Sequence, residues 1–529
     1  MDASMLRNYV STKGAAYSDL PFHLNLISSF VYGCNNPRDS FFSVNTPFFA
    51  GEPLAYPIIP NYHAAATMVT GLTTVRYALF VPAVFICFSL IVGIYSLTFY
   101  FTKRHFCAIV SLFIFTNLGG LGWTHKFDPK HADDPRRDWI HDWGNGQMEY
   151  WFHPIMHIII PQRSALWSLP LCFWIILMLA LAVEHHDLKM FILAGIFTGF
   201  LPQLQVHSFV AIAQYAVFLC LITFPFKSRI KFKKAFIQWA IYGIVANVIA
   251  FPQLIPFFGR VNKQKKSFLR INPIWNTPDK RKFKHPAIIL WWRGLGVFAA
   301  ISLIFGFASL DKWQITLYIP SIVTFILTNI IRYQPWELDN TKLFYASWIP
   351  LALGVVSQYL YYLVRKKKIF FLLIGIIIFV IFMVSMGLSA FMSTWQSFFY
   401  PTNIFSENDY RFGLWISENT NSKAVFLAEL PPMNPISTIG GRQCFVGYGG
   451  WAISHGLGYS RTMEQDLLYR NPGNIERFTQ YNISYLVTSI HSKFKDIKLD
   501  KNSPWKLIFN NFGYQVYRLV LNQSKVLFK

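Results

Sequence analysis

Long apolar segments follow one another almost without interruption between residues 77 and 393. A helix needs about 20 apolar residues to cross the hydrocarbon core of a bilayer. The segments 77–101, 166–183, 235–257 and 369–391 approach or exceed that length. Soluble proteins do not contain many successive helices that are apolar on every side. The sequence therefore predicts a multi-spanning membrane protein whose chemistry lies in the loops between its spans.

The apolar pattern predicts about ten membrane-spanning helices. They are expected at residues 77–102, 106–122, 166–184, 189–204, 207–226, 235–257, 287–309, 313–331, 343–364 and 369–393. The polar stretches divide the chain further. We expect an outer-face N-terminal segment (1–76) with an amphipathic helix, a transmembrane bundle (77–393) that contains a polar loop (123–165), and a soluble C-terminal domain (394–529).

The C-terminal stretch alternates two kinds of pattern. Short β-rich runs occur at 424–428, 444–446, 484–489 and 514–519, and residues 464–481 have helical spacing broken by Asn471-Pro-Gly473. This alternation is typical of a small α/β domain. The predicted fold class is therefore mainly α, a polytopic transmembrane helix bundle with a C-terminal soluble α/β domain.

The formal net charge of +23 does not indicate nucleic-acid binding, because the basic residues cluster in short loops beside the predicted spans. Such clusters set membrane topology and contact anionic lipid headgroups. The tight turns at 103–104, 227–234 and 365–368 are basic and should face the cytoplasm. An even number of spans then puts all the large polar segments on the lumenal or outer face. The basic loop 258–286 falls on that face as well, so a Lys/Arg count over all loops does not by itself decide the orientation.

Two glycosylation sequons, Asn482-Ile-Ser484 and Asn522-Gln-Ser524, support a lumenal tail. They predict a glycoprotein of the endoplasmic reticulum or another endomembrane in a eukaryotic cell; in a prokaryote the plasma membrane is expected. Only two of the six cysteines, Cys34 and Cys444, lie in polar stretches. They either pair in an oxidising compartment or remain two spare thiols.

The stretch 17–30 combines an apolar, helix-prone pattern with one acid and one histidine. Asp19 and His23 are four residues apart, so a helix presents them on one face. A carboxylate just outside a membrane bundle suits general-base work on an acceptor. The simpler alternative is that Asp19 caps a helix that begins near Pro21.

The loop 123–165 is rich in His, Asp and Arg. His153 and His157 have the spacing with which one helical face binds a metal, so a divalent cation is one reading and a solvated mixed-charge loop is the other. No tight metal motif is present. Arg163, in Pro161-Gln-Arg163, stands directly before a span, where an arginine can bind a phosphate.

Two further outer loops carry polar residues at the edge of the bilayer. His207 follows Gln205 in a short turn, and Arg332, Asp339, Asn340 and Lys342 lie in Arg332-Tyr-Gln-Pro-Trp-Glu-Leu-Asp-Asn-Thr-Lys342. Ionisable groups at this depth are costly and often functional, although snorkelling anchors also explain Arg332 and Lys342. The basic loop 260–284 is expected to attract a lipid phosphate or diphosphate, or else is a plain solvated loop.

The tail contains a glycine-rich stretch at 440–450, followed by 451–461, without the ending of a phosphate loop. Its glycines permit tight turns that present Arg442, Trp451, His455, Tyr459 and Arg461. Aromatic and polar side chains together suit a carbohydrate or a peptide, and they suit a domain that docks onto loops equally well.

Taken together, these motifs resemble those of uncharacterised multi-spanning proteins of bacteria and archaea, which are similar to the C-type glycosyltransferase superfamily. The motifs are Asp19-x-x-x-His23, Pro161-Gln-Arg163, the Gln334-Pro-Trp-Glu loop and the Gly441-Arg…Trp451…Ser454-His-Gly tail. The resemblance implies a catalytic acid in the first outer loop, matched here by Asp19, a lipid-phosphate sugar donor and an inverting transfer. It also implies a span before that loop. No such segment precedes Asp19, so either Met1 is an internal start or the chain differs at its active end.

The resemblance predicts a hexosyltransferase that works by in-line displacement at the anomeric carbon, with Asp19 as the base. Arg163, His207, Arg332 and Lys342 are expected to stabilise the leaving lipid phosphate, and His23, Asp339, Asn340, Arg442, Trp451 and His455 to contact substrates. Asp19, Arg163, His207, Arg332 and Asp339 are predicted to share one cavity. The acceptor is unknown.

Two other functions are weighed against this one. A transporter or lipid flippase is disfavoured, since no inverted repeat and no charged residue at mid-span is visible. A non-catalytic scaffold of the same fold is the third reading, favoured by the missing first span.

Overall fold

The computed structural model describes residues 10–12, 19–127, 153–225, 229–263, 269–273, 291–292, 294–334, 337–366, 368–399, 402–429, 433–490, 492–495, 497, 499 and 503–521. Residues 128–152 of the polar loop 123–165, most of the basic loop and the second sequon at Asn522 lie outside these residues. The chain forms two compact units. One consists mainly of Val81–Pro401, and the other combines the segment up to Phe80 with the tail from Thr402.

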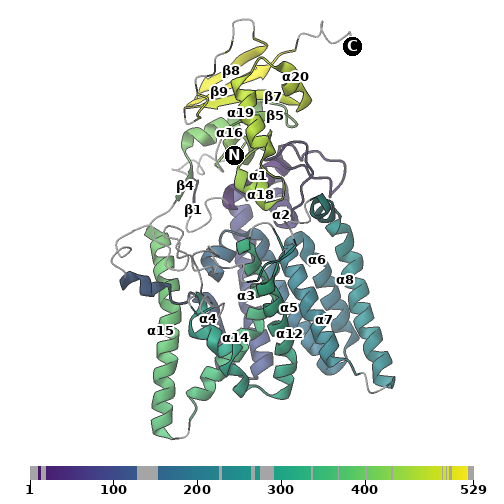
Figure 1. Ribbon diagram of the computed structural model, residues 1–529, viewed down its shortest axis with the longest axis vertical. Helices are drawn as coiled ribbons and strands as arrows, with labels where there is room; N and C mark the ends of the chain where they lie inside the picture. Colours follow the sequence, from purple (N-terminus) through teal and green to yellow (C-terminus); the bar gives the residue numbers. More distant parts are fainter. Residues whose placement is uncertain are drawn as a thin grey trace. The chain divides into compact units, whose positions relative to one another are not determined.

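The membrane unit is a bundle of long apolar helices (Figure 1). The described residues include seven that are long and apolar enough to cross a bilayer. They are α3 (Val75–Thr102), α5 (Arg163–His185), α7 (Val206–Thr223), α8 (Arg229–Lys263), α12 (Lys312–Ile330), the continuous run Thr341–Leu363 that ends in α14 (Ile349–Leu363), and α15 (Ile369–Phe399). Two shorter apolar helices, α4 (His105–Thr116) and α6 (Leu188–Leu204), match two further predicted spans.

The predicted span at 287–309 is wrong as a continuous helix. Its described part contains the short helix α11 (Val297–Leu303) and a 3-10 turn at Phe305–Ser309. Gly296 precedes α11 with φ +55°, a conformation that interrupts a helix and that glycine adopts at little cost. Gly306 lies against α14, where an added Cβ would be 2.4 Å from Val355 Cγ1. Gly296 therefore interrupts this segment where hydropathy alone predicts a span, and Gly306 lets its second half pack closely against α14.

Burial separates the centre of the bundle from its lipid-facing helices. The most apolar window of the span Thr341–Leu363 is 94% buried, whereas that of Ile369–Trp395 is only 17% buried. A helix that is apolar but exposed on most sides is suited to contact with lipid chains. The chain is therefore an integral membrane protein with α14 at its centre and α15 at its periphery.

The soluble part of the other unit is built on a five-stranded sheet of order β6-β5-β7-β9-β8. The parallel strands are β5 (Val425–Ala428), β6 (Gln443–Cys444) and β7 (Ile483–Ser489), and the antiparallel edge is formed by β9 (Tyr514–Leu519) and β8 (Trp505–Asn511). Four of these strands coincide with predicted runs. β8 was missed because most of its side chains are exposed, as befits an edge strand, and show no clean alternation.

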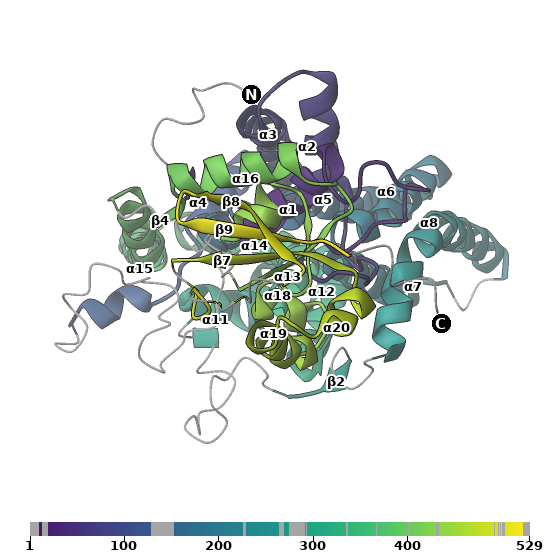
Figure 2. The same cartoon turned by 90° about the horizontal axis from the view of Figure 1, so that it is seen from above.

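Helices cover both faces of this sheet, as Figure 2 shows. On one face, Phe412 of α16 (Glu407–Asn419) packs in a cluster with Phe426 and Val487. On the other, Leu468 of α19 (Ser460–Arg470) and Phe478 of α20 (Ile475–Gln480) pack in a cluster with Leu427 and Leu486. The break predicted at 471–473 separates α19 from α20.

The N-terminal segment belongs to the same unit as the tail. Strand β1 (Val10–Thr12) pairs antiparallel with β4 (Thr402–Phe405), and Lys423 Nζ donates to the carbonyls of Cys34 and Pro37 at 2.8 and 2.7 Å. At Gly33 an added Cβ would be 2.0 Å from the carbonyl oxygen of Gly441. Two stretches treated separately in the sequence thus share one core.

Both cysteines of this unit are buried free thiols. Burial raises the pKa of the Cys34 thiol and that of the Cys444 thiol to about 12 each. Asn434 Nδ2 lies 3.3 Å from the Cys444 sulfur. The structure therefore favours two spare, unreactive thiols over the disulfide alternative.

Candidate functional site

In the membrane unit, several predicted residues gather where α5 and α7 begin. Gln205, the residue before α7, accepts hydrogen bonds at its side-chain oxygen from Ser168 of α5 (2.9 Å) and Ser208 of α7 (2.6 Å). These bonds tie together the helix starts that carry Arg163 and His207. Arg163 is the first residue of α5 and is buried.

His207 is anchored by the loop that follows α12. Its Nε2 lies 2.7 Å from the side-chain oxygen of Gln334, a buried residue of the Gln-Pro-Trp-Glu motif. Because an amide oxygen only accepts, His207 carries a hydrogen on Nε2. The charges of Lys342 and Asp339 also interact electrostatically with the imidazole. The structure therefore places three of the predicted residues, His207, Asp339 and Lys342, in one neighbourhood.

The same loop contains a charged pair and a residue that fixes the loop conformation. Lys342 Nζ and Asp339 Oδ1 form an ion pair at 2.8 Å, with both side chains largely buried. Asn340 is fully buried: its amide donates to the carbonyls of Ile331 (2.8 Å) and Thr328 (3.4 Å) and accepts from the backbone of Tyr333 (3.1 Å). Asn340 thus holds the loop in shape and has little left for a substrate.

Two arginines from different loops face each other beside this loop. β2 (Arg270–Ile271) pairs antiparallel with β3 (Ile331–Arg332), and Arg270 is the cross-strand partner of Arg332. Like charges directly opposite one another destabilise a strand pair. An anion between the two guanidinium groups removes that penalty. The pair is therefore chemically suited to a phosphate.

The histidines considered for metal binding take part in local hydrogen bonds through Nδ1. His153 Nδ1 accepts from the backbone N–H groups of Ile155 and Met156, each at 3.2 Å, and so caps the short π-helix Pro154–Ile159. His157 Nδ1 accepts from the backbone of His153. Within the residues that the structure describes, no three His, Cys, Asp or Glu side chains converge.

In the other unit, α1 (Asp19–Val31) and the tail meet in an aromatic–histidine cluster. It consists of Phe22, His23, Phe48, Tyr56, Trp451 and His455. The Phe22 ring stacks on His455, with centroids 5.0 Å apart, and meets Trp451 edge-on at 5.5 Å. Asp19 is the first residue of α1, one turn before His23, and Pro21 lies in the first turn.

Hydrogen bonds fix how the two histidines of this cluster present their nitrogens. His455 Nδ1 lies 2.7 Å from the carbonyl oxygen of Trp451. A carbonyl oxygen only accepts, so Nδ1 carries the hydrogen and neutral His455 keeps its lone pair on Nε2. His23 is buried, and its Nδ1 lies 3.1 Å from the Asn61 side-chain oxygen. His455 is half-buried and His23 is buried, so His455 is the more accessible of the two.

Arg442 does not have the role that its sequence context suggests. It is 2% exposed, and its five N–H groups donate to Thr420 Oγ1 and to the carbonyls of Tyr32, Gly440, Ser417 and Thr420 at 2.6–3.0 Å. A guanidinium group has five donors. None is left for a substrate, so Arg442 joins the N-terminal segment to the tail.

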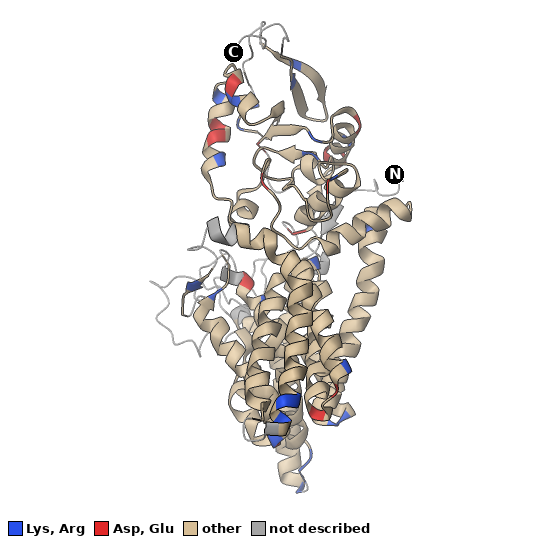
Figure 3. Cartoon of the chain, turned by 90° about the vertical axis from the view of Figure 1, so that its right-hand side faces the viewer, with Lys and Arg blue, Asp and Glu red and all other residues tan. Residues whose placement is uncertain are grey.

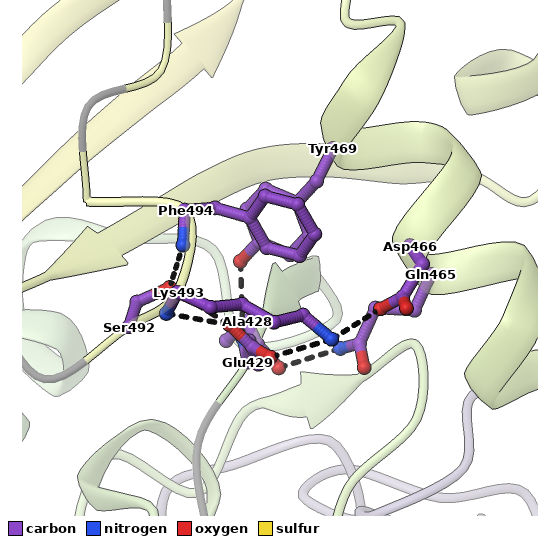
Figure 4. A network of polar contacts seen from close by, with 8 residues as sticks. All are labelled: Ala428, Glu429, Gln465, Asp466, Tyr469, Ser492, Lys493 and Phe494. Carbon is purple, nitrogen blue, oxygen red and sulfur yellow. Dashed lines mark hydrogen bonds and ion pairs between the residues drawn. The ribbon is translucent and has the colours of Figure 1, made fainter.

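After β5 the chain continues to β6 at one edge of the sheet, and after β7 it continues to β8 at the opposite edge. The place between the ends of two such neighbouring strands is the usual ligand site of open α/β sheets. Here the protein's own side chains occupy it (Figure 4). Lys493 bridges Glu429 (3.0 Å) and Asp466 (2.8 Å), and Ser492 donates to Glu429 at 2.9 Å. These groups satisfy one another, which makes the network a structural brace.

Sequence reasoning missed Phe22, Phe48, Tyr56 and Asn61, which contact the predicted residues. Phe22 lies inside the Asp19-x-x-x-His23 motif and Gln334 inside the Gln-Pro-Trp-Glu motif, so these two positions carried a signal, whereas Phe48, Tyr56 and Asn61 carried none. The tail residues Tyr459 and Arg461 do not enter the cluster; Arg461 donates to the carbonyls of Ala50 and Phe445.

Comparisons with known proteins concern the fold alone. No protein-family model and no curated protein matches the sequence. Among solved structures, the Archaeoglobus fulgidus oligosaccharyltransferase in complex with Zn and sulfate matches 91% of this chain at 12% identity and a TM-score of 0.54. This chain covers 65% of that enzyme, about two thirds of its length.

Two further structures hold lipid phosphates. The A. fulgidus oligosaccharyltransferase AglB, in complex with an inhibitory peptide and a dolichol-phosphate, matches 98% of this chain at 11% identity (TM-score 0.51; 71% of that chain). ArnT from Cupriavidus metallidurans, bound to undecaprenyl phosphate, also matches 98% (10% identity; TM-score 0.52; 97% of that chain). The resemblance predicted from the motifs is thus confirmed: this chain has the fold of the C-type glycosyltransferases.

Proposed function

We propose that this protein is a membrane glycosyltransferase that moves a hexose from a polyprenyl-phosphate-type donor to an acceptor on the lumenal or outer face. One observation carries the proposal. Two proteins that share the fold over 98% of this chain have structures with a polyprenyl phosphate bound. Neither a transporter nor a scaffold gains support from a specific contact among the described residues.

The cationic end of the membrane unit supports a phosphate-binding role. Arg270, Arg332 and Lys342 bring cationic N–H donors to this end, where Asp339 forms an ion pair with Lys342 and His207 is hydrogen-bonded to Gln334. Charge-assisted hydrogen bonds to phosphate are about twice as strong as neutral ones. In the proposal these groups stabilise the phosphate as it takes up the electron pair of the breaking bond.

Asp19 is the proposed base. Its carboxylate removes the proton of the acceptor group as that group attacks the anomeric carbon. The bond from that carbon to the phosphate oxygen breaks on the opposite side, so the configuration inverts, and the electron pair leaves with the lipid phosphate. Trp451 and His455 are proposed to contact the acceptor, because aromatic faces pack on sugar or peptide groups. No metal step is included.

Replacing Arg332 with Gln should weaken the use of the donor. The substitution removes the charge but keeps a polar side chain, and about 2 kcal/mol per charge-assisted hydrogen bond corresponds to a KM at least about tenfold higher. Transfer from a dolichyl-phosphate hexose by protein in liposomes measures this. Lys312→Gln at the start of α12 is the matched control and should keep the wild-type KM. Equal values for both variants would remove Arg332 from the proposal.

The proposed outer-face orientation is testable at Asn482. This asparagine is exposed, has φ +54° and precedes β7, so an attached glycan meets no packed core. Expression in a eukaryotic cell should add a glycan, seen as an increase in mass that glycosidase treatment removes. In a background where Asn522 is already replaced by Gln, Asn482→Gln should abolish the remaining increase in mass. A tail that proteases digest from the cytoplasmic side of sealed vesicles would overturn this orientation.

A further inference from the structure

The strongest feature outside the proposed site is a pair of arginines held by one tyrosine. Arg104, between α3 and α4, has its guanidinium carbon 4.5 Å from the centre of the Tyr361 ring and donates to the Tyr361 hydroxyl at 3.2 Å. Arg365, just beyond α14, also hydrogen-bonds to that hydroxyl, with its guanidinium carbon 5.4 Å from the ring. Tyr362 contacts Arg104 as well, at 3.5 Å.

The two positive charges are not neutralised by the part of the chain that the structure describes. Neither Arg104 nor Arg365 forms an ion pair there, and the Nε of Arg104 is buried without a hydrogen-bond partner. An unsatisfied buried donor costs about 1–3 kcal/mol, and more when it is charged. The Tyr361 hydroxyl accepts from both arginines, so its own hydrogen remains to be donated. All three groups thus offer hydrogen bonds to one anion.

The position along the helices identifies the kind of anion. Thr341–Leu363 starts beside Lys342 and ends just before Arg365, and a helix of 23 residues is about 34 Å long. The hydrocarbon core is about 30 Å thick. Arg104 and Arg365 therefore lie at the headgroup level of the leaflet opposite to the proposed donor site. Lysines 366 and 368 are exposed at the same end of the bundle, where basic residues gather in Figure 3.

An apolar surface leads away from the arginines along α4. Phe106, Ile109 and Phe113 recur on one helical face and are 40%, 61% and 44% exposed. The Phe106 ring lies 5.7 Å from Tyr361 and 6.3 Å from Phe379 of α15, measured between ring centres. A charged headgroup site that continues into a lipid-facing apolar stripe matches a lipid better than a soluble anion.

We propose that Arg104, Arg365 and Tyr361 form a binding site for the phosphate of an anionic membrane phospholipid, whose acyl chain lies along Phe106, Ile109 and Phe113. Basic residues near a span set topology without binding one lipid. That general role accounts for the two exposed lysines. It leaves unexplained two guanidinium groups fixed on one hydroxyl and a buried Nε–H. The site is separate from the proposed donor site and independent of the proposed function.

The test titrates the purified full-length protein, in a non-ionic detergent, with phosphatidylglycerol and with phosphatidylcholine of identical acyl chains. Native mass spectrometry counts the bound lipids. Wild-type protein should bind one phosphatidylglycerol at least about tenfold more tightly than phosphatidylcholine. Arg104→Gln/Arg365→Gln should lose that preference. Lys189→Gln/Lys312→Gln, which removes two exposed charges from the first turns of α6 and α12, should keep it.

Several outcomes would overturn the proposal. Equal affinity for the two lipids would exclude a headgroup site, and equal losses in both double variants would reduce the effect to general electrostatics. Displacement by glycerol phosphate at the same concentration would indicate a soluble anion. If the arginine variant does not fold, Tyr361→Phe takes its place. It keeps both charges and should lower the preference severalfold, whereas an unchanged preference would contradict the proposed role of the hydroxyl.

Discussion

Asp19→Asn should leave the protein folded and lower sugar transfer by a factor of about 10²–10⁴, the usual loss when a general base is removed. Asparagine caps a helix as well as aspartate does, so α1 should keep its start at residue 19. The measurement is transfer from a polyprenyl-phosphate hexose in liposomes, together with the melting temperature. Asp39→Asn, which removes an exposed acid from the same N-terminal segment, is the control and should retain full activity.

A wild-type rate in the Asp19→Asn variant would reduce Asp19 to a helix cap. The search for the base would then move to Glu52, Asp128 and Asp339. If the variant loses activity and its melting temperature also falls, Asp19 has a structural role and is removed from the mechanism.

Arg442→Met should destabilise the unit formed by the N-terminal segment and the tail by at least about 3 kcal/mol. Methionine fills much of the same volume, but it leaves four buried carbonyl groups without their donor. Arg470→Met, at the exposed end of α19, is the matched control and should change stability by less than about 0.5 kcal/mol. Limited proteolysis of the tail across a urea series measures both. Equal resistance of the two variants would show that the buried network contributes nothing to stability.

The membrane helices could be predicted because a single physical requirement, the thickness of the hydrocarbon core, determines their length. The failure at 287–309 has an equally simple cause. Hydropathy records how apolar a segment is and not whether glycines such as Gly296 interrupt it. In the tail, buried strands gave recognisable runs, whereas the edge strand β8 faces solvent and did not.

The candidate site was predictable only in part. The polar loop residues stood out, since charged groups are rare at the bilayer edge, and the structure groups His207, Asp339 and Lys342. What the sequence did not reveal was which of them face inward. Arg442 and Asn340 look like ligand-binding residues in a motif, but their partners are backbone carbonyls, which leave no trace in sequence. Whether Asp19 shares a cavity with the loop residues stays a prediction.

The aromatic–histidine cluster could not be predicted from the sequence for a different reason. Phe22 and His455 are separated by more than 400 residues, and nothing in either segment encodes their contact. Such pairs follow from how the N-terminal segment packs into the tail, through close approaches such as that of Gly33 to Gly441.

The most direct test of the proposed donor class is the binding of a polyprenyl phosphate compared with that of the matching polyprenol, because every donor of this class releases the same lipid phosphate whatever its sugar. Isothermal titration of the protein in detergent should give saturable binding of the phosphate at least about 100-fold tighter than that of the alcohol, and Arg332→Gln should lose most of the difference. Equal affinity for the two lipids, or a preference that Arg332→Gln leaves intact, would contradict a lipid-phosphate donor at this end of the bundle.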